Sequence, residues 1–278
     1  MHDQPIQRTG LIIACILALL FNIGYPLVDR GAKSFVVFCD VGQGDASYIH
    51  IEPSLDILID AGKYTSVDSC IRKNNRSFDK TIDAIFISHL QIDHFGGVES
   101  LRTRYKIAVV YVNTTPNMNM EARTLLSRLR SSHISILPVT AGDVFEIGDL
   151  RILTLWPTRD YLNALQDHSD PNTTSQILHI RYKQRTILYT GDILGDQWFS
   201  LSDKPIIKSD ILKVPHHGSK NGLNQNLLLL ADPTYSVISV GKNNPYGHPS
   251  REIIELMEKY KSQILRTDIL GDITFLLD

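Results

Sequence analysis

Residues 84–97 read AIFISHLQIDHFGG, and this stretch decides which fold the chain adopts. The apolar run Ala84–Ser88 combines β-branched and aromatic residues, which predicts a buried strand. His89, Asp93 and His94 follow the strand, and two glycines close the turn behind them. Ligand sites in α/β sheets form beyond the carboxyl ends of strands. The stretch therefore predicts a site built from imidazole and carboxylate groups.

The same arrangement recurs three times further along the chain. In each case an aspartate or a histidine follows an apolar run: Thr186–Tyr189 precedes Asp192, Ile211–Val214 precedes His216 and His217, and Tyr235–Val240 precedes His248. Taken singly, each motif has an ordinary structural explanation, such as a tight turn or a helix cap. Their shared order, always after a strand, favours a single site at one edge of the sheets.

The pattern of the whole chain predicts a mixed α/β fold with an antiparallel start. Short apolar runs predict ten strands, namely Ser34–Cys39, Ala46–Ile51, Asp56–Ile59, Ala84–Ser88, Ala108–Val112, Leu150–Leu155, Gln176–Tyr182, Thr186–Tyr189, Ile211–Val214 and Tyr235–Val240. Helical periodicity is visible in Val98–Arg104 and Glu121–Ser131. A third helix is expected to run to about Tyr260, because Ser250 is a good N-cap and Glu252 suits the first turn.

The residue types collected at the predicted site suit a divalent cation. Imidazole and carboxylate are ligands of zinc, and of manganese when carboxylates predominate. Without a cation, Asp93 and Asp192 would repel each other in a shared cleft. A bound metal lowers the pKa of water to about 7, and hydrolysis of an ester or phosphodiester follows. Asp60 ends a predicted strand and is a candidate carboxylate for orienting a ligating histidine.

Bulk composition excludes little. The chain has 278 residues and a formal net charge of −2, so no strong global field indicates nucleic acid, although a local basic groove stays open. Of the three cysteines, Cys15 lies in an apolar run, so at most Cys39 and Cys70 can pair, and no CxxC zinc motif exists. Four basic residues flank the motifs and are candidates for phosphate contacts or for ordinary solvated charge: Lys213, Lys220, Lys242 and Arg251.

The N-terminus differs from the remainder. Arg8 precedes the uncharged run Leu11–Phe21, which is short for a membrane-spanning helix of ~20 residues. This pattern predicts a signal peptide or a membrane anchor over residues 1–33, with a buried helix as the alternative. Residues 34–278 then form the hydrolase domain, and the protein is expected outside the cytoplasm, either secreted or anchored to a membrane.

Six motifs together resemble the hydrolase domain of ComEC-type competence proteins, which belong to the metallo-β-lactamase superfamily. The motifs are DVGQGDA (40–46), LIDAG (58–62), SHLQIDHFGG (88–97), TGD (190–192), VPHHGS (214–219) and SVGKNNPYGHP (239–249). The resemblance spans Ser34–Asp278 and implies a four-layer αββα sandwich. It also implies that His89, Asp93, His94, Asp192 and His248 bind metal, with Asp192 bridging two ions. His216 and His217 would then lie beside the substrate, as phosphate ligands or as the general acid.

Two departures from that family concern the first metal position. Gln91 stands where the family has a histidine or aspartate ligand, and a neutral amide is a poor zinc ligand. Pro171–Ser175 replaces the mid-chain histidine of the wider superfamily, and His168 nearby is a weak substitute. The expectation is therefore one or two ions of zinc or manganese.

The function expected from these observations is a phosphodiesterase or DNase in which a metal activates water, with a phosphodiester, including DNA, as the substrate. One alternative is hydrolysis of a small ester such as phosphorylcholine, because teichoic-acid phosphorylcholine esterase is a more distant relative with similar motif spacing. Another is a catalytically silent binding module, which Gln91 suggests. The oligomeric state is left open.

Overall fold

The computed structural model of the protein describes residues 33–74, 80–116, 118–166, 169–195, 197 and 207–278. Contacts separate Met1–Lys33 from a compact unit formed by Ser34–Asp278, and the account below concerns this unit. The apolar run Leu11–Phe21 lies outside the described residues. No helix among the described residues combines the length and the apolar character that crossing a bilayer requires.

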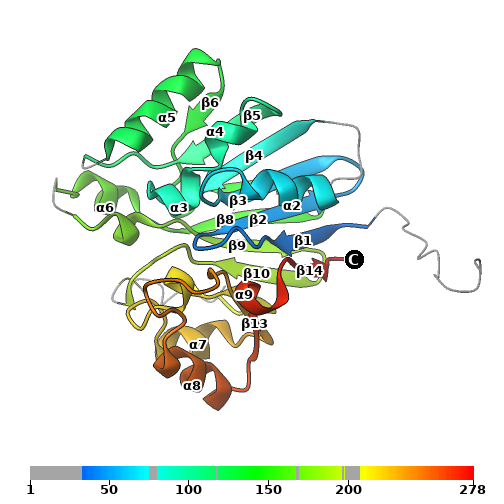
Figure 1. Ribbon diagram of the computed structural model, residues 1–278, viewed down its shortest axis with the longest axis vertical. Coiled ribbons are helices and arrows are strands. Elements are labelled where there is room, and N and C mark those ends of the chain that lie inside the picture. Colours follow the sequence, from blue (N-terminus) through cyan, green and yellow to red (C-terminus); the bar gives the residue numbers. More distant parts are fainter. Residues whose placement is uncertain (1–32, 75–79, 117, 167–168, 196, 198–206) are drawn as a thin grey trace, which may run out of the picture. The chain divides into compact units, whose positions relative to one another are not determined.

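Within the described residues, fourteen strands form two mixed sheets of seven strands each (Figure 1). The first sheet has the order β14-β1-β2-β3-β4-β5-β6 and comprises β1 (Phe35–Phe38), β2 (Ala46–Ile51), β3 (Leu55–Ala61), β4 (Thr81–Ile87), β5 (Lys106–Val112), β6 (Ser135–Leu137) and β14 (Ile273–Leu276). The second has the order β13-β12-β11-β10-β9-β8-β7 and comprises β7 (Val144–Ile147), β8 (Leu150–Trp156), β9 (Ile177–Tyr182), β10 (Arg185–Tyr189), β11 (Ile211–Lys213), β12 (Tyr235–Ile238) and β13 (Gln263–Arg266).

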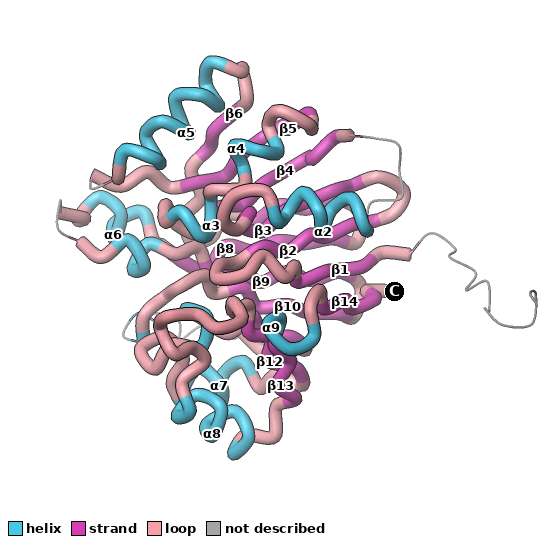
Figure 2. The backbone as a smooth tube through the Cα atoms, viewed as in Figure 1, coloured by secondary structure: helices cyan, strands magenta, loops and turns pink. Residues whose placement is uncertain are grey.

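The helices lie on the outer faces of the two sheets (Figure 2). They are α2 (Ser66–Asn74), α3 (Ile92–Phe95), α4 (Val98–Leu101), α5 (Met120–Ser131), α6 (Arg159–Asn163), α7 (Gln225–Ala231), α8 (Arg251–Lys259) and α9 (Thr267–Leu270). Two 3-10 turns, Pro171–Thr174 and Pro215–Gly218, complete the described helical segments.

Alternation along the strands distributes the core into three clusters. In β1, Val36 and Phe38 point into the cluster between the sheets, whereas Phe35 and Val37 point toward the helices on the outer face. The outer cluster of the first sheet includes residues of α2, α3, α4 and α5, and that of the second includes residues of α7 and α8. Burying both faces of both sheets requires four layers, so the predicted αββα sandwich is confirmed.

One predicted helix is present as expected, another is shorter than expected, and some strands were not predicted. The predicted helix after Ser250 is α8, and the Ser250 hydroxyl accepts a hydrogen bond from the Ile253 backbone at 3.4 Å. The predicted helix Val98–Arg104 is shorter and ends at Leu101. The four edge strands β6, β7, β13 and β14 were not predicted. Strand β14 pairs with β1 in register from Phe35–Leu276 to Phe38–Ile273, so its partner is the distant start of the domain.

The cysteines Cys39 and Cys70 form a disulfide with a Cα–Cα distance of 5.8 Å. This is the one pair that the sequence left open. The bond ties the end of β1 to α2, and Cys39 directly precedes the loop 40–45 that leads into the candidate site. It therefore restrains the beginning of that loop.

Candidate metal centre

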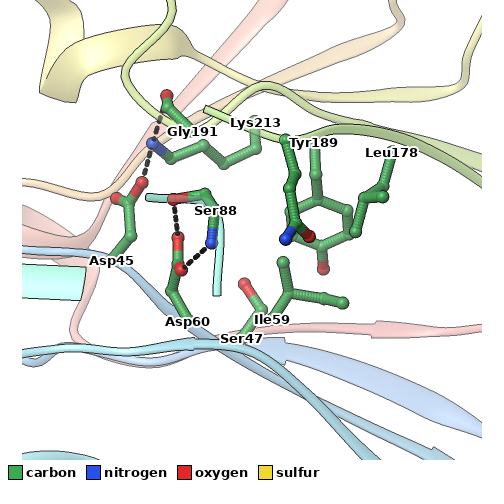
Figure 3. Close-up of a pocket in the computed structure, with 10 residues that line it drawn as sticks. Asp45, Ser47, Ile59, Asp60, Ser88, Leu178, Tyr189, Gly191 and Lys213 are labelled. Carbon is green, nitrogen blue, oxygen red and sulfur yellow. Dashed lines mark hydrogen bonds and ion pairs between the residues drawn. The ribbon is translucent and has the colours of Figure 1, made fainter. Parts of the chain in front are cut away.

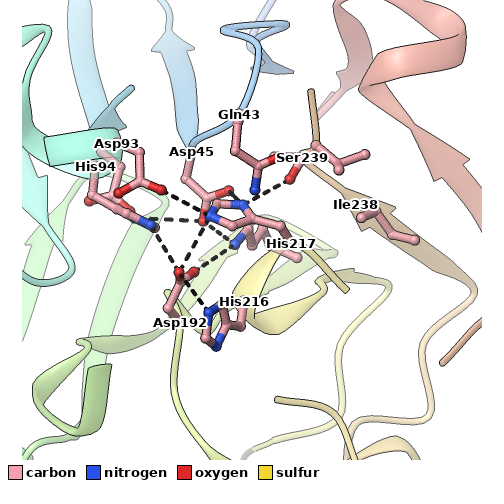
Figure 4. Close-up of polar contacts among 12 residues, drawn as sticks. Gln43, Asp45, Asp93, His94, Asp192, His216, His217, Ile238 and Ser239 are labelled. Atoms are coloured by element: carbon pink, nitrogen blue, oxygen red, sulfur yellow. Dashed lines mark hydrogen bonds and ion pairs between the residues drawn. The ribbon is translucent and has the colours of Figure 1, made fainter. Parts of the chain in front are cut away.

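The carboxyl ends of strands from both sheets meet at one edge of the sandwich. The first sheet supplies Asp60 at the end of β3, His89 after β4, and Asp93 and His94 from α3. The second sheet supplies Asp192 after β10 and the two histidines of the 3-10 turn after β11. The close-up shows Asp192 and His217 pointing toward Asp93 and His94, whereas His216 points toward Asp192 (Figure 4). The convergence inferred from the motifs is therefore present in the fold.

Close backbone approach makes this meeting possible. Gly191, next to Asp192, has φ +49°, and a Cβ atom there would lie 2.8 Å from the Cβ atoms of Ser88 and Ser175. Only glycine fits this contact without displacing its neighbours. The Ser175 hydroxyl accepts a hydrogen bond from the Asp192 backbone at 3.1 Å. Ser175 belongs to the segment that stands in place of the superfamily's mid-chain histidine, and this hydrogen bond helps to position Asp192.

Three distances between ligand-type atoms match the spacing of ligands around a tetrahedral cation. Asp192 Oδ2 lies 3.3 Å from His94 Nε2 and 3.4 Å from His217 Nε2, and Asp93 Oδ2 lies 3.5 Å from His217 Nε2. Ligands held at zinc-like distances in a tetrahedron are about 3.4 Å apart. The Nε2 atoms of His89, His94 and His217 are buried and have no hydrogen-bond partner among the described residues. Their lone pairs therefore suit a metal, and His89 forms a further ligand-type group with His94 and Asp192.

Hydrogen bonds to the other ring nitrogens fix these orientations. His94 Nδ1 lies 2.9 Å from Asp60 Oδ2, and Asp60 also accepts hydrogen bonds from the backbone and hydroxyl of Ser88 at 2.7 and 2.8 Å. His217 Nδ1 donates to the Ser239 carbonyl at 2.9 Å. A proton held on Nδ1 leaves Nε2 free as the ligand atom. Asp60 therefore has the orienting position expected from the sequence.

The charges of the cluster are strongly coupled. Burial alone would lower the pKa of His94 and of His217, but the facing carboxylates, above all Asp192, raise both pKa values well above the ordinary range. Burial likewise would raise the pKa of Asp192, but the two imidazoles hold it well below its ordinary value. His89 differs, because burial lowers its pKa to about 3. A cation can take the place of the protons that the coupled histidines otherwise retain.

Two histidines occupy positions other than the predicted ones. His217 was expected beside the substrate, yet its Nε2 lies among the ligand-type atoms. His248 was expected to bind metal, but it belongs to none of the ligand-type groups among the described residues and instead faces the ring of His216, with centroids 5.9 Å apart. The cause is the turn after β11, where His216 and His217 both adopt left-handed backbone conformations (φ 51° and 53°) and the second ring is directed inward.

Sequence reasoning missed a buried ion pair beneath the cluster. The Lys213 ammonium contacts the Asp45 carboxylate, and both residues are buried (Figure 3). Lys213 also donates to the Gly191 carbonyl at 3.3 Å and lies 3.9 Å from Asp192 Oδ1, while Asp45 Oδ1 lies 3.3 Å from His217 Nδ1. Lys213 is therefore neither a surface phosphate contact nor a solvated charge. A lysine inside an apolar strand run was the available signal, because such a residue needs a buried partner.

A cavity and an open pocket lie on either side of these residues. The cavity, of about 10 Å³, is lined by Asp45, Asp60, Ser88 and Lys213 among others and is too small for any substrate. The pocket, of about 370 Å³, has Asp93, Asp192 and His217 in its lining. The remaining lining residues are Gln43, Lys63, Gln91, Ile92, Asn119, His216, Tyr246 and His248. Asp93, Asp192 and His217 thus face a space of substrate size, whereas His89 and His94 do not line it.

Gln91 and His216 supply further polar groups to the pocket. Gln91 lines the pocket and precedes Asp93 by two residues. Among the described residues, the first metal position therefore has His89 and Asp192 but a neutral amide in place of a charged ligand. The pKa of His216 is lowered, mainly by burial, so its imidazole is neutral at neutral pH. His168, the considered substitute ligand, lies outside the described residues.

Comparisons with known proteins agree with this fold and site. The chain is 29% identical to ComE operon protein 3 of Bacillus subtilis over 98% of this chain and 36% of that protein, and 31% identical to competence protein ComA of Neisseria gonorrhoeae over 96% and 36%. It therefore spans about a third of the length of these relatives. The solved metallo-beta-lactamase fold protein YhfI of Bacillus subtilis is 12% identical, with a TM-score of 0.59 over 88% of this chain and 100% of that chain.

The family profile of the metallo-beta-lactamase superfamily matches residues 39–242. That range includes every residue of the imidazole–carboxylate cluster, from the loop after Cys39 to the turn containing His217. The resemblance to ComEC-type competence proteins read from the motifs is confirmed by the curated relatives. With its αββα sandwich and a ligand-type cluster at the shared strand edge, this chain belongs to the metallo-beta-lactamase superfamily of hydrolase-type folds.

Proposed function

We propose that the chain is a metal-dependent phosphodiesterase that acts on nucleic acid. The observation that carries the proposal is the set of three inter-ligand distances of 3.3–3.5 Å among Asp93, His94, Asp192 and His217, three of which (Asp93, Asp192 and His217) line an open pocket. These four residues would hold one divalent ion. When bound, such an ion supplies Lewis-acid activation of water at neutral pH. Two histidines of the pocket lining outside this set, His216 and His248, remain to bind and orient the substrate.

His216 is the candidate group for the leaving oxygen. Its side chain is 25% exposed, its Nε2 lies 3.9 Å from Asp192 Oδ2, and it lines the pocket beside His248. A neutral imidazole can donate an N–H hydrogen bond to a phosphate oxygen and so stabilise the charge that develops on a departing oxygen. His248, also with a lowered pKa, is placed to contact the same phosphate. The ligand role first inferred for His248 is thereby reassigned to His217.

The decisive experiment separates ligands from substrate contacts. Purified protein is reconstituted with manganese or zinc, its metal content is measured, and turnover is assayed on single-stranded DNA, double-stranded DNA and a phosphorylcholine diester. His217→Ala is expected to lose the metal, whereas His216→Ala and His248→Ala keep it and lose turnover by ~100-fold. His133→Ala, at an exposed histidine outside the cluster, is the control and should change neither quantity.

Several outcomes would contradict the proposal. Turnover only of the phosphorylcholine diester would favour the small-ester alternative. Stoichiometric metal without turnover of any substrate would favour a binding module, for which the amide at Gln91 is the specific supporting observation. Loss of metal from His248→Ala with full retention in His217→Ala would restore the original ligand assignment.

We also propose that the domain works outside the cytoplasm. Residues 1–33 would direct its export or anchor it to the membrane. The supporting observation is the bond between Cys39 and Cys70, because disulfides persist mainly in oxidising compartments. Fusing residues 1–33 to a reporter that is active only after export should give a positive signal. A fully cytoplasmic, soluble reporter would count decisively against this proposal.

A further inference from the structure

One aromatic side chain stands unusually exposed at the pocket. Tyr246 is 67% exposed, although it lines the same pocket as Asp192 and His217. A large ring left in solvent beside a candidate active site has unburied apolar faces available to a ligand. The phosphodiesterase role proposed for the pocket does not by itself use this ring.

The ring is held in place by its loop rather than by packing. Its plane is inclined by only 19° to the ring of His248, with centroids 5.8 Å apart. The side chain of Asn244 organises the loop, accepting from the backbones of Tyr246 and His248 at 3.2 and 3.0 Å and donating to the His248 carbonyl at 2.7 Å. Gln43 Oε1 accepts from the Gly241 backbone at 3.1 Å, which ties the loop to the first sheet. The stacked pair is therefore preorganised.

The rest of the pocket lining carries a cation and a polar group. Lys63 and Asn119 line the pocket, and the Lys63 ammonium lies 5.0 Å from the centroid of the Tyr64 ring. The acidic residues in the lining are Asp93 and Asp192, both candidate metal ligands. A ligand in this pocket thus meets a flat aromatic face, a positive charge and the metal-ligand cluster.

We propose that Tyr246 is a stacking platform for a nucleobase next to the scissile phosphate, so that the pocket takes single-stranded nucleic acid. This inference rests on the proposed phosphodiesterase function and adds the form of its substrate. Aromatic rings bind bases through their faces, and in a duplex both faces of a base are already covered by its neighbours. Lys63 suits a neighbouring phosphate, whereas it would repel a quaternary ammonium group such as choline. A single stacked ring is also not a cage around a cation.

Binding to a non-hydrolysable oligonucleotide tests the platform directly. The probe is a fluorescent single-stranded phosphorothioate oligonucleotide, compared by anisotropy with an abasic oligonucleotide of the same length, using metal-loaded protein. Tyr246→Ala should weaken binding of the base-bearing probe by roughly 5- to 100-fold and leave binding of the abasic probe unchanged. Tyr246→Phe and Tyr246→Trp should restore the preference for bases. Ile269→Ala, at a side chain that is also 67% exposed, is the matched control.

The outcomes separate this inference from the proposed function. If Tyr246→Ala binds both probes as the unmodified protein does, or loses both equally, the platform is refuted even when phosphodiester hydrolysis is found. Absence of any oligonucleotide binding by the unmodified protein also refutes it. If no phosphodiester is hydrolysed but the base-dependent loss appears, the proposed catalytic function fails and the platform stands. Unchanged metal content in Tyr246→Ala excludes an indirect effect through the metal cluster.

Discussion

Replacing Lys213 by methionine should expose how much the fold depends on the buried ion pair under the metal cluster. Lys213 and Asp45 are 2% and 4% exposed, so neither charge is screened by water. Methionine keeps the length of the apolar stem but leaves the Asp45 carboxylate buried without its cation. Breaking a buried pair from one side typically costs about 3–5 kcal/mol. With a urea m-value of about 2–3 kcal/mol/M, the unfolding midpoint should fall by roughly 1–2.5 M.

A double-mutant cycle distinguishes the pair from a general packing defect. Adding Asp45→Asn to Lys213→Met removes the unpaired charge, so the double variant should recover much of the lost stability. Urea unfolding is measured on metal-free protein, so that metal release does not enter the transition. Lys242→Met, at an exposed lysine, should stay within ~0.5 kcal/mol of the unmodified protein.

The same pair should influence metal binding through its neighbour. Asp45 Oδ1 lies 3.3 Å from His217 Nδ1, so loss of Lys213 disturbs a group beside a candidate ligand. Outer partners of metal ligands typically change affinity by about 10- to 100-fold, which a competition titration with a chelating dye can measure. A destabilisation below ~1 kcal/mol in Lys213→Met, or no recovery on adding Asp45→Asn, would refute the reasoning.

Three further predictions concern other parts of the chain. Gln91→His should raise the bound metal toward two ions per chain, because it supplies the missing ligand beside His89; unchanged metal content by elemental analysis would show that the first position does not depend on residue 91. Replacing Cys39 and Cys70 together by serine should lower the free energy of unfolding by about 3–4 kcal/mol, since the bond closes a loop with a sequence separation of 31, and equal unfolding midpoints with and without reductant would contradict this. The Asp56 hydrogen bond raises the pKa of His50, so its stabilisation is complete below pH ~6.5 and is lost as pH rises through the folded-state pKa. The difference in Tm between the unmodified protein and His50→Gln should therefore shrink from pH 5.5 to 9, and a constant difference would be inconsistent with the predicted charge.

The fold class was predictable from local information. The apolar run Ala84–Ser88 and the three later runs that precede an aspartate or a histidine are visible in short stretches of sequence. Their recognition depends only on neighbouring residues, so it does not require knowledge of the tertiary structure. The four edge strands, β6, β7, β13 and β14, were not predicted. In β14, for example, the four residues Ile273–Leu276 acquire strand structure by pairing with β1 from the opposite end of the domain. Such a pairing leaves no signal within the short segment itself.

Within the candidate site, the sequence specified which kinds of ligand gather, and the assembled sheets decided which atoms meet. Asp93, His94 and Asp192 are recognisable because their motifs are contiguous. The position of the His217 ring among the ligand-type atoms depends on a left-handed turn that directs this ring inward, and a backbone torsion of that kind is not encoded by residue type. The contact of Lys213 with Asp45 joins residues far apart in the chain and on different sheets, so it exists only once the two sheets have packed face to face.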